Sequence, residues 1–369
     1  MQFGAGIAVG RGDLFASAKT AAGGSMTSDP DLTIVFATPD AAGMLEGRRG
    51  PGRLIGCIAD GVIGGTTEAE DGPAVAVWQA AFGDVAWTLS RVGAVRSGTA
   101  MSITGWRHPD EPIGTILLAD PASFPTQPFI DGLGRQQIPV IGGLATSSSG
   151  TRLMVDGDVQ STGAIAITFG EGVALSTAVS QGCRPIGKPG VVTKAKGHHL
   201  IEISGRTAFT YLSETFQALD EHDQALAQRG LQLGIVRNEY QDRFDLGDFL
   251  IRPVMNLDRD LGYITCGSAT EVGQTVQFHV RDPESAASEL TAMLARVQAM
   301  SGAGALLFTC NGRGRSFFGR PNHDAETVDS IRHPAALAGF FAAGEIGPVG
   351  GDNHLHGYTA SLVELSAAG

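Results

Sequence analysis

The sequence lacks the cysteine patterns that mark small zinc sites and redox pairs. It contains four cysteines in 369 residues, and they are isolated from one another at Cys57, Cys183, Cys266 and Cys310. Because no CxxC spacing occurs, neither a zinc knuckle nor a thioredoxin-like pair is indicated. Four reduced thiols in a cytosolic protein are the simplest interpretation.

An excess of positive charge and a long apolar run are also missing. Lys and Arg number 26 against 38 Asp and Glu, which gives a net charge of −12. Neutralising phosphates requires clustered Lys and Arg, so a nucleic-acid partner or an anionic membrane surface is not expected. The longest apolar segment, residues 335–344, is too short to span a bilayer. No basic region precedes the first apolar residues, so we predict a cytoplasmic protein without a membrane partner.

Glycine is abundant, with 52 residues, and it follows apolar runs without a collagen-like period. Such glycines indicate turns and close backbone contacts. The GAG at Gly4–Gly6 does not make a dinucleotide fingerprint, because the third glycine is misplaced at Gly10. At this length we expect two halves or domains rather than one core.

One order of elements recurs along the chain: a short apolar strand, a helix, a glycine-broken strand and a closing strand. The repeated glycine-broken text reads LIGCIADGVIGG, then VIGGLATSSSG, then LAGFFAAGEIGPVGG. Three copies cover residues 32–82, 115–169 and 305–365, and a weaker fourth copy spans 231–280. Apolar periodicity predicts two long amphipathic helices, at 207–228 and 283–300. We therefore predict an α+β fold of layered mixed β-sheets with helices on the outer faces, built from repeated strand–helix–strand–hairpin units in two halves.

A glycine- and arginine-rich loop follows the strand of the third copy. It contains Cys310, Asn311, Arg313 and Arg315, with Arg320 close behind. Loops at strand ends are common ligand sites, glycines let backbone N–H groups approach an anion, and Arg grips a carboxylate with two bonds. Glu345, in the later GEIG segment, offers the opposite charge that the ammonium of an amino acid would need. The alternative is that these charges pair with each other or with nearby acids and only hold the fold.

Two other chemistries are open for the same region. His323 and Asp324 with His354 and His356 could bind a metal, whereas a helix cap at His323 or Asp324 and surface histidines are the simpler reading. Cys310 with His323 could form a thiol nucleophile and base, whereas a buried structural cysteine is more common. We assign no metal, no cofactor and no catalytic residue.

Long segments resemble the FIST family, named for F-box and intracellular signal transduction proteins. The similar segments are Ser180–Gly205, Ala305–Val328 and Leu337–Leu365, and the resemblance extends from about residue 32 to 365. It implies a FIST N-terminal domain, placed at 1–225, and a FIST C-terminal domain, placed at 226–369. It also implies a sensory role in signal transduction, with small molecules such as amino acids as ligands.

The sequence therefore predicts a non-enzymatic, cytoplasmic sensor of an amino acid or small carboxylate. An unknown signalling partner would act in trans, and self-association into a homo-oligomer is left open. A cysteine- or metal-dependent hydrolase and a protein–protein interaction scaffold are the alternatives. The predicted ligand-binding residues are Cys310, Asn311, Arg313, Arg315, Arg320, His323, Asp324 and Glu345.

Overall fold

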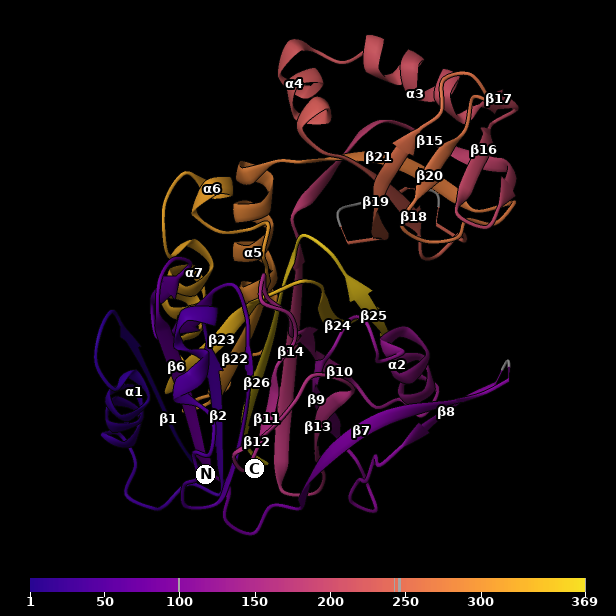
Figure 1. Cartoon of the computed structure of the whole chain (residues 1–369). Helices are drawn as coiled ribbons and strands as arrows, with labels where there is room; N and C mark the ends of the chain where they lie inside the picture. The colour runs from indigo at the N-terminus through magenta and orange to yellow at the C-terminus, as the bar shows by residue number, and fades with distance from the viewer. Residues whose placement is uncertain (99, 242, 245–246, 369) are drawn as a thin grey trace. The chain divides into compact units, whose positions relative to one another are not determined.

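The computed structural model describes residues 1–98, 100–241, 243–244 and 247–368, which fold into two compact units (Figure 1). The core unit comprises Met1–Val179, Leu290–Leu355 and Thr359–Gly369. The inserted unit comprises Ser180–Glu289 and His356–Tyr358. The sequence places the boundary between the two FIST domains between residues 225 and 226. That domain boundary stays a prediction.

The core unit contains three mixed sheets, each built on one parallel pair of strands. The first has the order β1-β6-β2-β3-β11-β12, the second β25-β24-β10-β9-β13-β7-β8, and the third β14-β26-β22-β23-β4-β5. The strands of the first two thirds of this unit are β1 (Gln2–Val9), β2 (Leu32–Ala37), β3 (Arg53–Ile58), β4 (Val62–Gly64), β5 (Thr67–Ala69), β6 (Ala74–Ala81), β7 (Trp87–Ser97), β8 (Ala100–Thr104), β9 (Gly114–Ala119), β10 (Val140–Leu144), β11 (Leu153–Val155), β12 (Asp158–Gln160) and β13 (Ala164–Phe169). The remaining strands are β14 (Val173–Gln181), β22 (Gly304–Cys310), β23 (Ala336–Ala342), β24 (Glu345–Val349), β25 (Asp352–His356) and β26 (Thr359–Ala367).

Three successive chain segments have the same strand order, which makes the core unit an internal triplicate. In each, an opening strand lies beside the closing strand, and the closing strand lies beside the parallel pair: β1-β6-β2-β3, β7-β13-β9-β10 and β14-β26-β22-β23. The repeats predicted at 32–82, 115–169 and 305–365 are these segments without their opening strands. The fourth predicted copy, at 231–280, is wrong, because its strands pair only in antiparallel fashion with their neighbours.

Each repeat passes one hairpin to another sheet. After β3 the chain crosses to the third sheet, where β4 pairs with β23; after β23 it crosses to the second, where β24 pairs with β10. After β10 it crosses to the first sheet, where β11 pairs with β3. The glycine-broken segments of the sequence are therefore the points at which the chain leaves one sheet for the next.

One glycine stands at the same place in each parallel pair. Gly56 lies opposite Val35, Gly142 opposite Leu117, and Gly339 opposite Leu307. A Cβ at these glycines would lie 2.3, 1.9 and 1.8 Å from the facing carbonyl oxygen. The close approach of two backbones explains why the repeated text keeps a glycine there.

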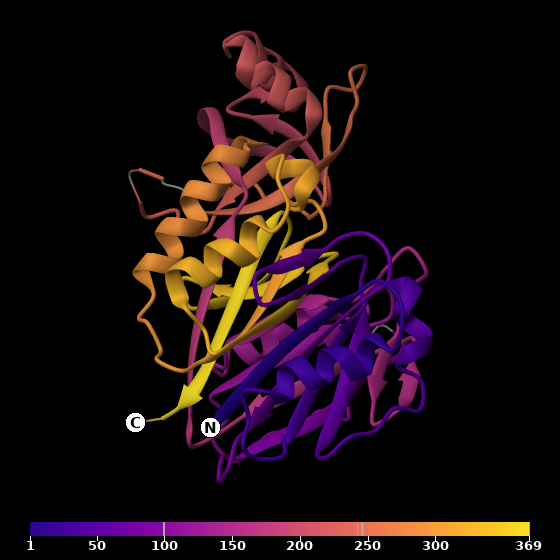
Figure 2. The same ribbon diagram turned by 90° about the vertical axis from the view of Figure 1, so that its left-hand side faces the viewer.

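Side-chain alternation along the strands creates one shared inner core and separate outer layers. On β22, Leu306 and Phe308 face the shared core, where Phe340 packs between Phe36 and Phe308. Ala305 and Leu307 face outward, against α5 (Pro283–Arg296) and α7 (His323–Arg332). The other helices of this unit are α1 (Leu14–Gly23), η1 (Pro39–Met44), α2 (Thr126–Gly134) and α6 (Arg315–Phe318). Figure 2 shows helices on the outside of the sheets, and the predicted α+β class is confirmed.

The inserted unit is a separate β-barrel with its own core. Its sheet has the order β15-β21-β18-β19-β20-β16-β17, and the additional pairing of β15 with β16 closes it. The strands are β15 (Cys183–Lys196), β16 (His199–Ile203), β17 (Arg206–Thr207), β18 (Leu231–Val236), β19 (Phe249–Leu257), β20 (Ile264–Cys266) and β21 (Thr275–Arg281).

The single helix predicted at 207–228 is wrong. Two helices form instead, α3 (Ala208–Gln217) and α4 (Glu221–Arg229), because Asp220 accepts the N–H of Asp223 and starts a new helix. Tyr211 and Leu212 of α3 and Leu226 of α4 pack on the barrel core. The helix predicted at 283–300 is confirmed as α5. Within the described part of the chain, no helix is long and apolar enough to cross a membrane.

Candidate functional site

The predicted site region is the loop between β22 and α7, and its geometry depends on how α7 begins. Asn322 adopts a left-handed conformation, with φ 61° and ψ 20°, and is the N-cap. Glu68 of β5 then accepts the N–H of Ala325 at 2.8 Å, and its own N–H donates to Asn322 Oδ1. A capping role for His323 or Asp324 is therefore wrong, because Asp324 is committed to a different partner.

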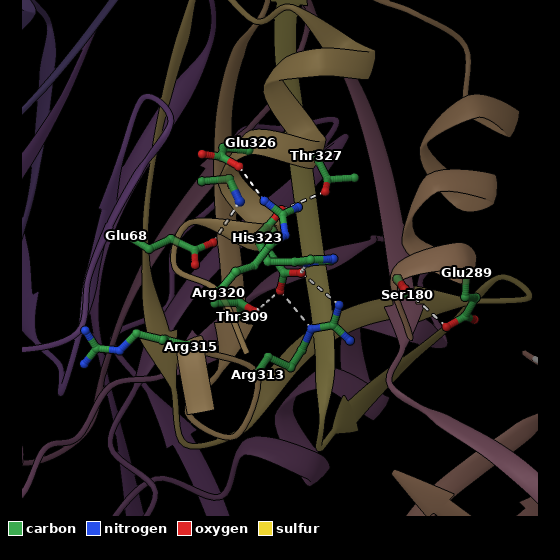
Figure 3. Close-up of polar contacts among 12 residues, drawn as sticks. Glu68, Ser180, Glu289, Thr309, Arg313, Arg315, Arg320, His323, Glu326 and Thr327 are labelled. Carbon is green, nitrogen blue, oxygen red and sulfur yellow. Dashed lines mark hydrogen bonds and ion pairs between the residues drawn. The ribbon is translucent and has the colours of Figure 1, made fainter. Parts of the chain in front are cut away.

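That partner is Arg313, and the two form a buried ion pair. Arg313 Nε donates to Asp324 Oδ2 at 2.8 Å and Nη2 to Oδ1 at 3.0 Å. Both side chains are almost inaccessible, at 1% and 2% exposure. Thr309 Oγ1 also donates to Asp324 Oδ2, at 2.5 Å, from the end of β22 (Figure 3). The carboxylate thus ties the loop to both the strand and the helix.

Aromatic packing closes the pair from one side. The ring of Phe318 in α6 stacks on His323, with centroids 3.5 Å apart, and lies 5.2 Å from the Arg313 guanidinium carbon. His323 Nδ1 lies 2.9 Å from Asp324 Oδ1. Burial opposes the ionisation of Asp324, but Arg313, His323 and Thr309 together hold its pKa well below the usual range. The Asp324 carboxylate is therefore held as an anion by its three neighbouring side chains.

Glu345, the first residue of β24, enters the same region from the later segment. Its side chain is inaccessible to solvent, and Oε2 accepts both the N–H and the hydroxyl of Thr359, at 3.0 and 2.8 Å. Burial raises the pKa of this carboxyl to about 8, although Thr359, Arg313 and Cys310 lower it in part. The Arg313 charge is thus one of the groups that act on the Glu345 carboxyl.

Cys310 ends β22 next to this carboxyl. Its thiol acts on Glu345 as a hydrogen-bond donor, and its Sγ accepts the N–H of Gly312 at 3.4 Å. His323, the base considered from the sequence, is instead turned to Asp324.

The other predicted residues lie on the exposed side of the loop. Arg315 pairs with Asp71, and Arg320 pairs with Glu326 at 2.6 Å. Figure 3 shows Arg315 directed away from Thr309, Arg313 and His323. Arg313 is therefore buried, whereas Arg315 and Arg320 are exposed, and the three arginines do not form a single cluster.

Asn311 meets the other two repeats at an exposed junction that the sequence analysis did not single out. Asp60, which follows β3, accepts the N–H of Ser148 at 2.8 Å through Oδ1 and lies 3.5 Å from Asn311 Nδ2 through Oδ2. Ser148 follows β10 and Asn311 follows β22, so the carboxyl ends of all three parallel pairs meet at Asp60. The signal in the sequence was the lone acid in the repeated LIGCIADGVIGG text.

The histidines do not gather into a metal site. His354 and His356 lie on β25, and His356 belongs to the inserted unit. Across residues 1–98, 100–241, 243–244 and 247–368, no group of three or more His, Cys, Asp or Glu residues could hold a metal ion.

Comparison with known proteins finds two family models along the chain, and the boundary between them lies inside the inserted unit. The sequence matches the FIST N domain model over residues 31–206 and the FIST C domain model over residues 208–348. It is 44% identical over 322 residues to the uncharacterized protein Rv0628c of Mycobacterium tuberculosis, covering 85% of this chain and 83% of that protein. It is 41% identical over 322 residues to the uncharacterized protein Mb0898c of Mycobacterium bovis, covering 85% and 82%.

Proposed function

The chain belongs to the FIST family, whose domains are associated with signal transduction, and we propose that it is a sensor of an amino acid or a small carboxylate. The ligand binds at the exposed junction around Asp60, Ser148 and Asn311, next to the loop that carries Arg315. The observation that supports this position is the contact of Asp60 with both other repeats. Ligands in α/β sheets commonly sit at the carboxyl ends of parallel strands.

The charges at this junction suit an α-amino acid. Asp60 is exposed and offers a carboxylate for the ammonium group. Arg315, four residues after Asn311, offers a guanidinium for the carboxylate. Arg315 and its partner Asp71 are 57% and 76% exposed, and exposed pairs contribute only about 0–1 kcal/mol. Exchanging Asp71 for a ligand carboxylate is therefore inexpensive.

The buried residues have a supporting role in this proposal. Arg313 and Asp324 hold the loop from inside, so that Asn311 and Arg315 are presented in one geometry. Cys310 and Glu345 anchor the start of the loop, while His323 and Phe318 pack its far side. A binding loop fixed by an internal network loses little freedom when a ligand arrives. A separate signalling protein that binds this chain would transmit the signal.

Isothermal titration calorimetry with free amino acids and with matched carboxylates that lack the amine tests the proposal. We expect one class to bind, and Asp60→Asn and Arg315→Gln to weaken that binding by about tenfold or more each, the loss expected of a charged contact. Arg320→Gln is the matched control, because Arg320 is similarly exposed but pairs with Glu326 of α7. Absence of binding at millimolar ligand, or an equal loss in the control variant, contradicts the proposal. Light scattering on the same samples reports any self-association.

A further inference from the structure

Cys310 differs from the other cysteines in its surroundings. It is 8% exposed, whereas Cys57, Cys183 and Cys266 are 1–2% exposed and lie inside apolar clusters. Burial raises the pKa of the Cys266 thiol to about 12 and that of Cys57 further still. Those thiols are held in the unreactive protonated form.

The groups around Cys310 are those that stabilise a thiolate and accept its proton. The Gly312 N–H points to Sγ at 3.4 Å, which favours negative charge on sulfur. Arg313, three residues on, is a positive charge that acts on the neighbouring Glu345. Within the described residues, Oε1 of Glu345 is buried without a conventional hydrogen bond, while Oε2 is held by Thr359. One oxygen of the carboxyl is thus fixed by Thr359, and the carboxyl also takes a hydrogen bond from the Cys310 thiol.

We propose that Cys310 is a reactive thiol that small hydroperoxides oxidise to a sulfenic acid, and that Glu345 is the positioning residue that takes up and returns its proton. This inference does not rest on the proposed ligand site. Glu345, and not His323, is the proton acceptor, because His323 is bonded to Asp324.

The reaction balances without a further reagent. Glu345 accepts the thiol proton, and the thiolate sulfur attacks one peroxide oxygen, so that an S–O bond forms as the O–O bond breaks. Sulfur loses two electrons and the peroxide gains them. The departing oxygen, hydroxide from hydrogen peroxide or alkoxide from an organic hydroperoxide, takes the proton from Glu345, and the products are Cys310 sulfenic acid and water or the alcohol. The carboxyl can take the thiol proton because its raised pKa, about 8, makes it a stronger base than an ordinary carboxylate.

The experiment exposes the full folded chain to hydrogen peroxide in the presence of dimedone, which traps sulfenic acid, and follows each cysteine by peptide mass spectrometry. We expect Cys310 to be labelled about tenfold or more faster than Cys57 in the same sample, within the usual range for positioned acid–base groups. Glu345→Gln should lower the Cys310 rate by a similar factor. Glu326→Gln, an exposed change on α7, should leave it unchanged.

A second variant separates proton transfer from simple access. Glu345→Asp keeps a carboxyl but places it farther from the thiol, so we expect a Cys310 labelling rate between those of the wild type and Glu345→Gln. If Glu345→Gln does not fold, the rate of Glu345→Asp tests the proposal in its place. Circular dichroism establishes the folding of each variant. A Cys310 rate equal to that of Cys57 overturns the proposal, and so does a wild-type rate retained in the folded Glu345 variants, since exposure alone would then explain the labelling.

Discussion

Arg313 and Asp324 meet through two parallel hydrogen bonds, 2.8 and 3.0 Å long, in a place that solvent barely reaches. Asp324 also accepts from Thr309, so the strand end, the loop and α7 share one anion. A buried pair of this kind costs free energy to desolvate and is therefore weak evidence for stability as such. Its effect here is to fix the path of the loop between two elements.

Breaking that pair should destabilise the core unit strongly. Asp324→Asn leaves the Arg313 charge buried without its counter-charge, and we expect a loss of about 3–5 kcal/mol in the free energy of unfolding. Urea denaturation followed by circular dichroism measures the loss. Glu326→Gln, which removes the exposed partner of Arg320, should change stability by less than about 1 kcal/mol. Equal effects of the two changes would contradict the internal role of Asp324.

The stability of the fold should decrease from mildly acidic to basic pH. Burial raises the pKa of Glu68 and Glu345 from 4.5 to about 8, and Asp324 adds to the effect at Glu68. The folded chain therefore binds more protons than the unfolded chain between these values, and the free energy of unfolding falls as the pH rises through them. Asp324 has the opposite sign, because its lowered pKa adds stability that is lost as the pH falls below 3.8. Urea titrations at pH 5, 7 and 9 should show the decrease, and Glu345→Gln should flatten it; a slope unchanged by Glu345→Gln would refute this assignment.

The glycine inside each parallel pair should not tolerate a side chain. Gly339→Ala would place a methyl group 1.8 Å from the Leu307 carbonyl oxygen, so the two strands must separate. We expect a loss of more than about 3 kcal/mol, in the range of severe core substitutions. Gly43→Ala is the control, because a Cβ there meets nothing within 4 Å. Thermal unfolding of both variants makes the comparison, and similar melting temperatures would disprove the close approach.

The side-chain amide of Asn353 bonds the third repeat to the second. Asn353 Oδ1 accepts the N–H of Val140 at 2.9 Å, and Nδ2 donates to the carbonyls of Ile138 and Ile130 at 2.8 and 3.2 Å. Asn353→Ala leaves these buried groups unsatisfied, and we expect it to cost about 2–4 kcal/mol. Gln136→Ala removes an exposed amide from the end of α2 and should be nearly neutral. Chemical denaturation measures both, and a neutral Asn353→Ala would exclude this role.

The sequence predicted the parts of the fold that local patterns encode. Short apolar strands and the glycines at 56, 142 and 339 indicated a repeated unit, because both signals come from neighbouring residues. The exchange of hairpins between sheets depends on pairings between residues as distant as Val62 and Phe340, for which the local text carries no signal. The break between α3 and α4 was missed because the apolar stripe continues across it, although Asp220 offered a cap.

The candidate site was predicted in part for the same reason. Arginines in an acidic protein are usually exposed, so nothing nearby indicated that Arg313 would be buried. Its partner Asp324 is eleven residues away, and a helix cap accounted for that carboxylate locally. Asp60 belongs to the site because it contacts Ser148 and Asn311, which lie 88 and 251 positions away in the sequence. Only the folded chain brings these groups together.

Each of the three repeats places one hairpin in the sheet of another repeat, and its own sheet receives a hairpin from the remaining repeat. An isolated repeat would have a hairpin with no sheet to pair with. Its own sheet would have an unpaired edge strand where the hairpin of another repeat normally binds. The core unit must therefore assemble as a whole, and a chain with two repeats is not a smaller version of this protein.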